Sequence, residues 1–174
     1  MSPSTSNRTN TKVDEQENHL PLFDRSLPMM LKRARESVMS RFMPALKAHD
    51  LSAEQWRAMR VLDQNNGMNI SELSKRCYVL KPSMTRIIQN LENRGIIERR
   101  SLGTDQRLIS IFLTDTGRNL INLIAPTSEA RYHQITEKFG DKKLNELTGL
   151  LDELMLALHE LDEEEAASKS APKR

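Results

Sequence analysis

This chain of 174 residues contains few of the residue types and sequence features that mark several other protein classes. Its one cysteine, Cys77, excludes an internal disulfide framework and a cysteine-rich zinc site. Glycine (6), proline (7) and aromatic residues (4%) are few, which argues against a turn-rich all-β fold. No run approaches the roughly 18 consecutive apolar residues of a membrane span, and the N-terminal segment lacks the apolar core of a secretory signal. The sequence therefore predicts a cytoplasmic protein without membrane contact.

The small net charge of +2 conceals an asymmetry along the chain. Residues 57–107 carry ten basic side chains against five acidic ones, a net charge of +5. Residues 141–165 carry nine acidic side chains against two lysines, a net charge of −7. A run of charge is usually only a solvated face, but a basic middle segment is also typical of a module that binds a polyanion such as nucleic acid.

Between two polar ends, the apolar residues follow helical spacing. Residues 1–25 and 163–174 are predicted to be a disordered arm and tail. Residues 27–49 predict one long helix, with Pro44 as its weakest point. Ser52 and Gln55 form a capping-box signature for the next helix. Ser71 is the expected cap of a short helix over residues 72–78.

A helix with one apolar and one polar face is predicted for residues 82–94. Pro82 suits its first turn, and Gly95 ends it. Met84, Ile87, Ile88 and Leu91 form the apolar stripe. The opposite face carries Ser83, Thr85, Arg86, Gln89, Asn90 and Arg94. Short hydrogen-bonding side chains together with arginine are what a helix needs to read base edges in the major groove of DNA.

The apolar period then changes from helical to alternating. Residues 96–100 and 108–113 predict a β-hairpin whose polar tip contains Asp105 and Arg107. A helical pattern resumes after Thr114, is interrupted at Pro126 and stops near Gly140. The last helix is rich in leucine and needs a partner to bury its stripe. The expected fold is mostly α with a small β-hairpin wing, in which a winged helix-turn-helix lobe occupies about residues 52–113.

Two short patterns connect this arrangement to a known family. The stretch DQRLISIFLTDTGR (residues 105–118) contains Asp-x-Arg, a strand and Leu-Thr-x-x-Gly, and residues 91–97 read Leu-x-x-x-Gly-x-Ile. With these patterns, residues 27–162 resemble the MarR family of dimeric bacterial transcription regulators. Within the family, the segments RARESVMSRFMP, EQWRAMRVL and CYVLKPSMTRII look like the regulators of homoprotocatechuate and 4-hydroxyphenylacetate degradation operons.

The resemblance implies a homodimer, assembled through helices at about residues 27–49 and 114–162, that binds a near-palindromic site on double-stranded DNA. Residues 82–94 would be the recognition helix. Arg107 would enter the minor groove, braced by Asp105, and basic side chains such as Lys81 would contact phosphates. The expected DNA-binding residues are Ser71, Lys81, Ser83, Thr85, Arg86, Gln89, Asn90, Arg94, Arg99, Arg100, Asp105 and Arg107.

The resemblance also implies a small aromatic carboxylate as effector and an aromatic-acid catabolic operon as target. Arg35 lies at the edge of the apolar stripe of the first helix, where it either binds the carboxylate, extends across the stripe into water, or pairs with an acid at the dimer interface. Met39, Trp56 and Met59 are the expected walls around the aromatic ring, and Arg57 is the other candidate end of the site.

The sequence leaves two other functions open. Cys77, next to Arg76, is a candidate redox sensor with a lowered pKa, although a cysteine in a short helix is more often a small buried apolar residue. A helical adaptor that binds only protein is the second, and it would have no use for Arg107. The four histidines show no metal-binding spacing, so the sequence predicts no metal, no cofactor and no enzyme.

Overall fold

The structure is a computed structural model that describes residues 23–101 and 109–170. The chain divides into two compact units, Met1–Val38 and Met39–Arg174. The described part of the first unit contains a short 3₁₀ helix, η1 (Phe23–Arg25), and the beginning of α1 (Leu27–Lys47). The expected DNA-binding residues from Ser71 to Arg100 all belong to the second unit.

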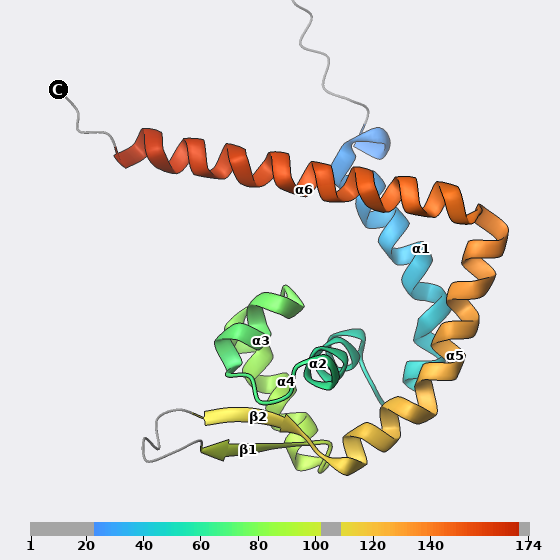
Figure 1. Cartoon of the computed structure of the whole chain (residues 1–174), viewed down its shortest axis with the longest axis vertical. Helices are drawn as coiled ribbons and strands as arrows, with labels where there is room; N and C mark the ends of the chain where they lie inside the picture. The colour runs from blue at the N-terminus through green and yellow to red at the C-terminus, as the bar shows by residue number, and fades with distance from the viewer. Residues whose placement is uncertain (1–22, 102–108, 171–174) are drawn as a thin grey trace, which may run out of the picture. The chain divides into compact units, whose positions relative to one another are not determined.

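The second unit continues with α2 (Ala53–Gln64), α3 (Ile70–Cys77), α4 (Lys81–Asn93), β1 (Ile97–Ser101), β2 (Ile109–Leu113), α5 (Asp115–Phe139) and α6 (Asp141–Ser170) (Figure 1). β1 and β2 pair antiparallel, from Ile97 opposite Leu113 to Ser101 opposite Ile109. Met68 adds a single bridge to Ile111. This arrangement confirms the predicted fold class, mostly helical with one two-stranded hairpin.

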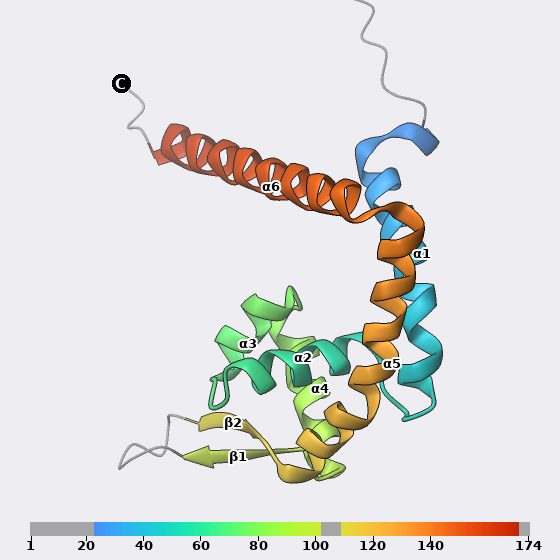
Figure 2. The same cartoon turned by 45° about the vertical axis from the view of Figure 1, so that its right-hand side comes forward.

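The core of the second unit is formed where α2, α3 and α4 pack together and against the hairpin (Figure 2). Each of these helices turns an apolar stripe inward, as the spacing predicts. The fully buried side chains include Met59 and Leu62 of α2, Leu73 and Cys77 of α3, Met84, Ile88 and Leu91 of α4, and Ile97, Ile111 and Leu113 of the strands. α4 is therefore anchored along its whole length, which fixes the orientation of its opposite face.

The Leu-Thr-x-x-Gly pattern after β2 has a direct structural cause. Thr114 is the N-cap of α5: its Oγ1 accepts a hydrogen bond from the Gly117 amide at 3.1 Å and donates to the Ile96 carbonyl at 2.9 Å. A Cβ on Gly117 would lie 2.3 Å from that same Ile96 carbonyl oxygen. Only glycine permits this approach, so the pattern joins the start of α5 to the hairpin.

Helix ends agree with the sequence in some places and differ in others. The capping box at Ser52 is confirmed, since Ser52 Oγ accepts from the Gln55 amide at 3.1 Å and Gln55 Oε1 accepts from the Ser52 amide at 2.8 Å. The prediction that Ser71 caps α3 is wrong. Asn69 is the cap, with its Oδ1 accepting from the Glu72 amide at 2.9 Å, because an asparagine two residues earlier serves the same purpose.

The two last helices are longer and more continuous than predicted. α5 passes through Pro126 without a break, since the missing amide affects only the carbonyl of Asn122, an exposed residue. α6 extends to Ser170 and so contradicts a disordered segment starting at Glu163. Residues 163–169 are exposed, and the helix there is stabilised locally, as by Lys169 Nζ and Glu165 Oε2 at 3.2 Å. The predicted arm at residues 1–22 and residues 171–174 lie outside the described residues.

Candidate functional site

The solvent-exposed face of α4 is polar except for Pro82 in its first turn. Met84, Ile88 and Leu91 hold the helix to the core, and the side chains opposite them are exposed. These exposed side chains are Lys81, Ser83, Thr85, Arg86, Gln89 and Asn90, six of the twelve residues predicted to contact DNA. Leu80, the N-cap of α4, provides no side-chain hydrogen bond to the first turn. The positive end of the helix dipole and Lys81 therefore lie together at this end of the face.

Hydrogen bonds within the protein already orient part of this face. Asn90 Oδ1 accepts from Gln55 Nε2 of α2 at 2.7 Å. Thr85 Oγ1 donates to the Lys81 carbonyl at 3.0 Å, and Gln89 Nε2 donates to Asn93 Oδ1 at 3.4 Å. Because the side-chain oxygen of Asn90 accepts the bond from Gln55, the side-chain NH₂ group of Asn90 is the donor that it can offer to a partner.

Arginines beside this face are positioned by different partners. Arg99 Nε lies 3.3 Å from Glu92 Oε2, which connects β1 to α4. Arg100 pairs with Glu98, and its guanidinium carbon lies 4.9 Å from the centre of the Phe112 ring. Both side chains are more than one third exposed, so they present positive charge beside the helix.

Arg94, a predicted DNA contact, makes hydrogen bonds within the chain that the sequence did not indicate. Its two terminal nitrogens donate to the carbonyls of Asp50, at 2.8 Å, and His49, at 2.9 Å. The chain turns here with Asp50 at φ 52°. Arg94 is half-buried and connects the end of α4 to the segment before α2. Ser71 is half-buried on α3 as well, and Asp105 and Arg107 lie outside the described residues.

A cavity of about 330 Å³ lies between α2 and α5, with Met39 of α1 at its edge. Met39, Trp56 and Arg57, three of the predicted effector residues, line it. Met59 does not: it is fully buried in the core, because the turn of α2 that carries Trp56 toward the cavity points Met59 inward. Arg35 is exposed on the part of α1 that belongs to the first unit, and its predicted role stays a prediction.

Most of the remaining cavity lining comes from α5, far along the sequence. The lining residues that the sequence did not indicate are Ala53, Arg60, Ala125, Ser128, Glu129 and Tyr132. The Tyr132 ring also packs against Phe42, with centroids 4.9 Å apart. The Arg60 guanidinium carbon lies 5.9 Å from the centre of the Trp56 ring. The cavity thus combines aromatic walls, two guanidinium groups and one carboxylate, a composition suited to a small aromatic anion.

The structure does not favour Cys77 as a redox sensor. The side chain is fully buried in α3, and this burial raises the pKa of the Cys77 thiol, with only a partial opposing effect from the positive charge of Arg57. Arg76 instead pairs with Glu72 at 3.0 Å. Since the thiolate is the reactive form, a buried thiol with a raised pKa is an apolar core residue.

Two further features are absent from the described residues. They contain no group of three or more His, Cys, Asp or Glu side chains arranged to hold a metal ion. Their helices also include none with the length and apolar character that crossing a membrane requires.

The sequence is similar to known proteins. Residues 51–109, which include α2, α3, α4 and β1, match the MarR family. The homoprotocatechuate degradative operon repressor of Escherichia coli is 38% identical over 130 residues, covering 75% of this chain and 88% of the relative.

Two solved structures are similar over most of this chain. One is NadR in complex with 4-hydroxyphenylacetate, at 31% identity and a TM-score of 0.70, covering 78% of this chain and 99% of NadR. The other is the transcriptional repressor CouR bound to a 23-mer DNA duplex, at 26% identity and a TM-score of 0.70, covering 79% of this chain and 99% of CouR.

Proposed function

This chain belongs to the MarR family of transcriptional regulators, and from that premise we propose that it is a repressor of an aromatic-acid catabolic operon that a small phenolic carboxylate releases from DNA. It would act in the cytoplasm as a homodimer on a near-palindromic operator. The exposed face of α4 is the observation that carries the proposal. A helix fits the major groove, and this face offers hydroxyl, amide and guanidinium groups there.

The contacts on DNA divide into two kinds in this proposal. Arg86, Gln89 and the amide group of Asn90 read base edges. Lys81, Arg99 and Arg100 bind phosphates, which positions the dimer without reading sequence. Asp105 and Arg107 keep their predicted place at the tip of the wing. Arg94 we now assign to stability, because its guanidinium is bound to the carbonyls of His49 and Asp50.

The cavity between α2 and α5 is the proposed effector site. Its volume of about 330 Å³ suits one small aromatic ring with short substituents. Arg57 and Arg60 would bind a carboxylate, Trp56 and Tyr132 would enclose the ring, and Glu129 would accept a hydrogen bond from a phenolic hydroxyl. Because a hydroxyl donor and an anion sit at opposite ends of 4-hydroxyphenylacetate, this compound is the effector we propose to test. NadR, a structural relative, binds it.

The apolar face of α6 supports the homodimer. Leucines recur at heptad spacing, at positions 144, 147, 151, 154, 158 and 161, and no side chain of α6 is buried within the described residues. A second copy of α6 running antiparallel would pair these leucines with one another. The same register places Lys142 and Lys143 beside Glu163 and Asp162 of the copy, whereas a parallel pair would bring the acidic ends together.

The proposal is tested by selecting a binding duplex from random DNA and titrating it by fluorescence anisotropy. We expect a palindromic consensus, an affinity that falls steeply with salt, and release of the duplex by 4-hydroxyphenylacetate. The neutral 4-hydroxyphenylacetamide is the matched control, which lacks the carboxylate and should not release it. A protein that selects no duplex, and is not retained on heparin, would instead be the helical adaptor.

A further inference from the structure

Arg57 makes contacts at two places in the second unit. Its side chain lines the cavity between α2 and α5, and its Nη1 donates a hydrogen bond of 2.7 Å to the carbonyl of Cys77. That carbonyl belongs to the last turn of α3, where the helix has no following amides to satisfy it. One guanidinium group therefore connects the wall of the cavity to the end of α3.

The segment that follows Cys77 sets where α4 begins. Tyr78 adopts the left-handed conformation (φ 51°, ψ 46°), which is uncommon for a large side chain, and the residue is 88% exposed. The Tyr78 amide donates to the Lys75 carbonyl and the Val79 amide to the Ser74 carbonyl, both at 3.1 Å. The hydrogen bond from Arg57 of α2 to the Cys77 carbonyl supports the chain directly before this strained turn.

We propose that Arg57 couples the cavity to the α3–α4 turn: a carboxylate bound in the cavity takes the Arg57 guanidinium from the Cys77 carbonyl and so loosens the turn. The exchange is favourable because a guanidinium binds a carboxylate through two charge-assisted bonds and a carbonyl through one bond to a neutral oxygen. This inference rests on the proposed function, since it requires an anionic effector in this cavity.

The effect on α4 is concentrated at its N-terminal end. Gln55, on α2, holds Asn90 in the C-terminal half of α4 at 2.7 Å and does not line the cavity. Loosening the turn therefore acts on the half of α4 that carries Lys81, Ser83 and Arg86, and shifts it while Met84 stays in the core. Because coupling between two sites is reciprocal, bound DNA lowers the affinity for the carboxylate by the same factor.

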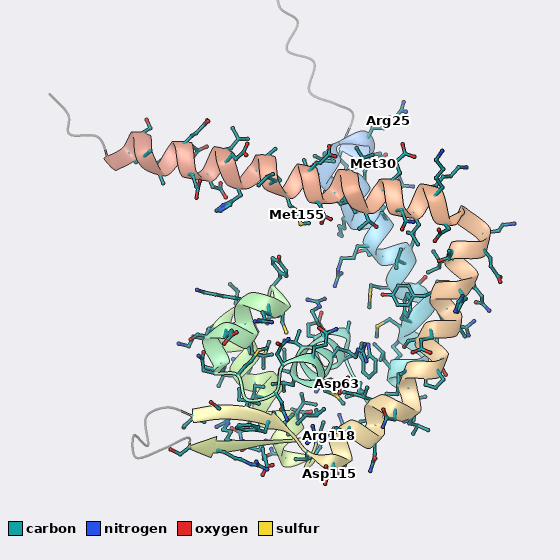
Figure 3. The ribbon with its side chains drawn as sticks, in the orientation of Figure 1. Arg25, Met30, Asp63, Asp115, Arg118 and Met155 are labelled. Atoms are coloured by element: carbon teal, nitrogen blue, oxygen red, sulfur yellow. The ribbon has the colours of Figure 1, made fainter. Side chains whose placement is uncertain are left out.

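Arg60 provides a matched comparison within the same helix. It also lines the cavity, but its contacts run to Trp56, at 5.9 Å, and to Asp63, at 3.5 Å, both on α2. Figure 3 labels Asp63 on this helix. Replacing Arg60 changes the charge of the cavity by the same amount as replacing Arg57, and leaves the bond to the turn in place.

The test compares the full chain with Arg57→Gln and Arg60→Gln, using the selected duplex and 4-hydroxyphenylacetate. Duplex affinity is measured by anisotropy, effector binding by the fluorescence of Trp56, and the turn by NMR hydrogen exchange at the Tyr78 and Val79 amides. In the wild type, the effector should accelerate exchange at both amides. Arg57→Gln should show the fast exchange without effector and should weaken duplex binding by about tenfold, the factor for one ordinary hydrogen bond.

The release ratio, which is the duplex affinity without effector divided by that at saturating effector, separates the two arginines. The release ratio should fall to about twofold or less in Arg57→Gln. In Arg60→Gln it should keep its wild-type value, although a higher effector concentration is needed to reach saturation. Slow exchange at Tyr78 and Val79 in Arg57→Gln, or full release by that variant, would overturn this inference and leave the proposed function standing. A wild type that the effector does not bind would overturn the effector role itself, and this inference with it.

Discussion

Helices α4 and α6 differ in the side chains that they expose to solvent. α4 buries Met84, Ile88 and Leu91 in the core of its own chain and exposes a polar, basic face. α6 buries no side chain among its described residues and exposes leucine and methionine side chains, of which Met155 is labelled in Figure 3. A helix whose apolar face is already buried in its own chain presents hydrogen-bonding groups to a partner. A helix whose apolar face is still exposed presents apolar surface.

The difference indicates which kind of partner each helix is suited to. A polar face that is held rigidly from behind suits DNA, where groups must be aligned with base edges. An apolar face with heptad spacing suits another helix, since burying it releases about 25 cal/mol for each Å² of apolar surface. The comparison therefore predicts that changes in α6 act on assembly, and that changes in α4 act on recognition.

The largest expected effect comes from removing α6. A chain that ends at Gly140 should be monomeric in sedimentation and should lose measurable binding to a palindromic duplex, because each half-site then binds alone. Leu158→Asp should have the same effect, since it places a charge in the leucine stripe, whereas Glu153→Ala, outside that stripe, should leave the dimer intact. A dimeric chain ending at Gly140 would assign assembly to other elements.

The second effect concerns the exposed face of α4. Arg86→Ala or Gln89→Ala should each cost about 1–3 kcal/mol of binding to the selected duplex and relax the preference at one base position. Lys81→Ala should weaken binding to all duplexes alike and reduce the salt dependence by about one phosphate contact. Equal effects of Arg86→Ala on selected and random duplexes would show that Arg86 binds the backbone of the DNA instead of a base.

The two arginines of the α4 region sharpen the comparison further. Arg94→Ala should lower the free energy of unfolding by about 1–3 kcal/mol, because it removes two charge-assisted bonds to the carbonyls of His49 and Asp50. Arg86→Ala, on the exposed face, should change that free energy by less than about 0.5 kcal/mol. Urea titration measures both. Unchanged stability of Arg94→Ala, with weakened DNA binding, would restore Arg94 to the DNA-binding set.

These residues also show how far the sequence leads. Spacing alone separates the buried Met84, Ile88 and Leu91 from the exposed side chains of α4, because a helix has one fixed period. It cannot show that Arg94 binds carbonyls 44 and 45 positions earlier, nor that Glu129 and Tyr132 share a cavity with Trp56. Those contacts depend on how helices pack. The cap of α3 was missed for a local reason, since Asn69 and Ser71 are both good N-cap residues and only the backbone decides.

A smaller effect is expected from the charges at the ends of α6. If two copies pair antiparallel, Lys142→Glu with Lys143→Glu should weaken the dimer by up to about 1 kcal/mol for each exposed pair. Adding Asp162→Lys and Glu163→Lys should restore it. Sedimentation at low and high salt measures both, since salt screens such pairs. A four-fold variant that dimerises less well than the double variant would contradict the antiparallel register.

The smallest effect is expected at Cys77, which is fully buried at the end of α3. Burial raises its pKa from the ordinary value of 9.0, so its contribution to stability is complete below that pH and is lost as pH rises through the higher pKa of the folded state. Cys77→Ala should cost about 1 kcal/mol at neutral pH, through lost packing, and should flatten the alkaline decline in the free energy of unfolding. Duplex binding and its release by 4-hydroxyphenylacetate should stay at wild-type levels in this variant, before and after treatment with hydrogen peroxide. Loss of duplex binding in the peroxide-treated wild type alone would reinstate the thiol as a sensor, because Cys77 is the only cysteine of the chain and the variant lacks it.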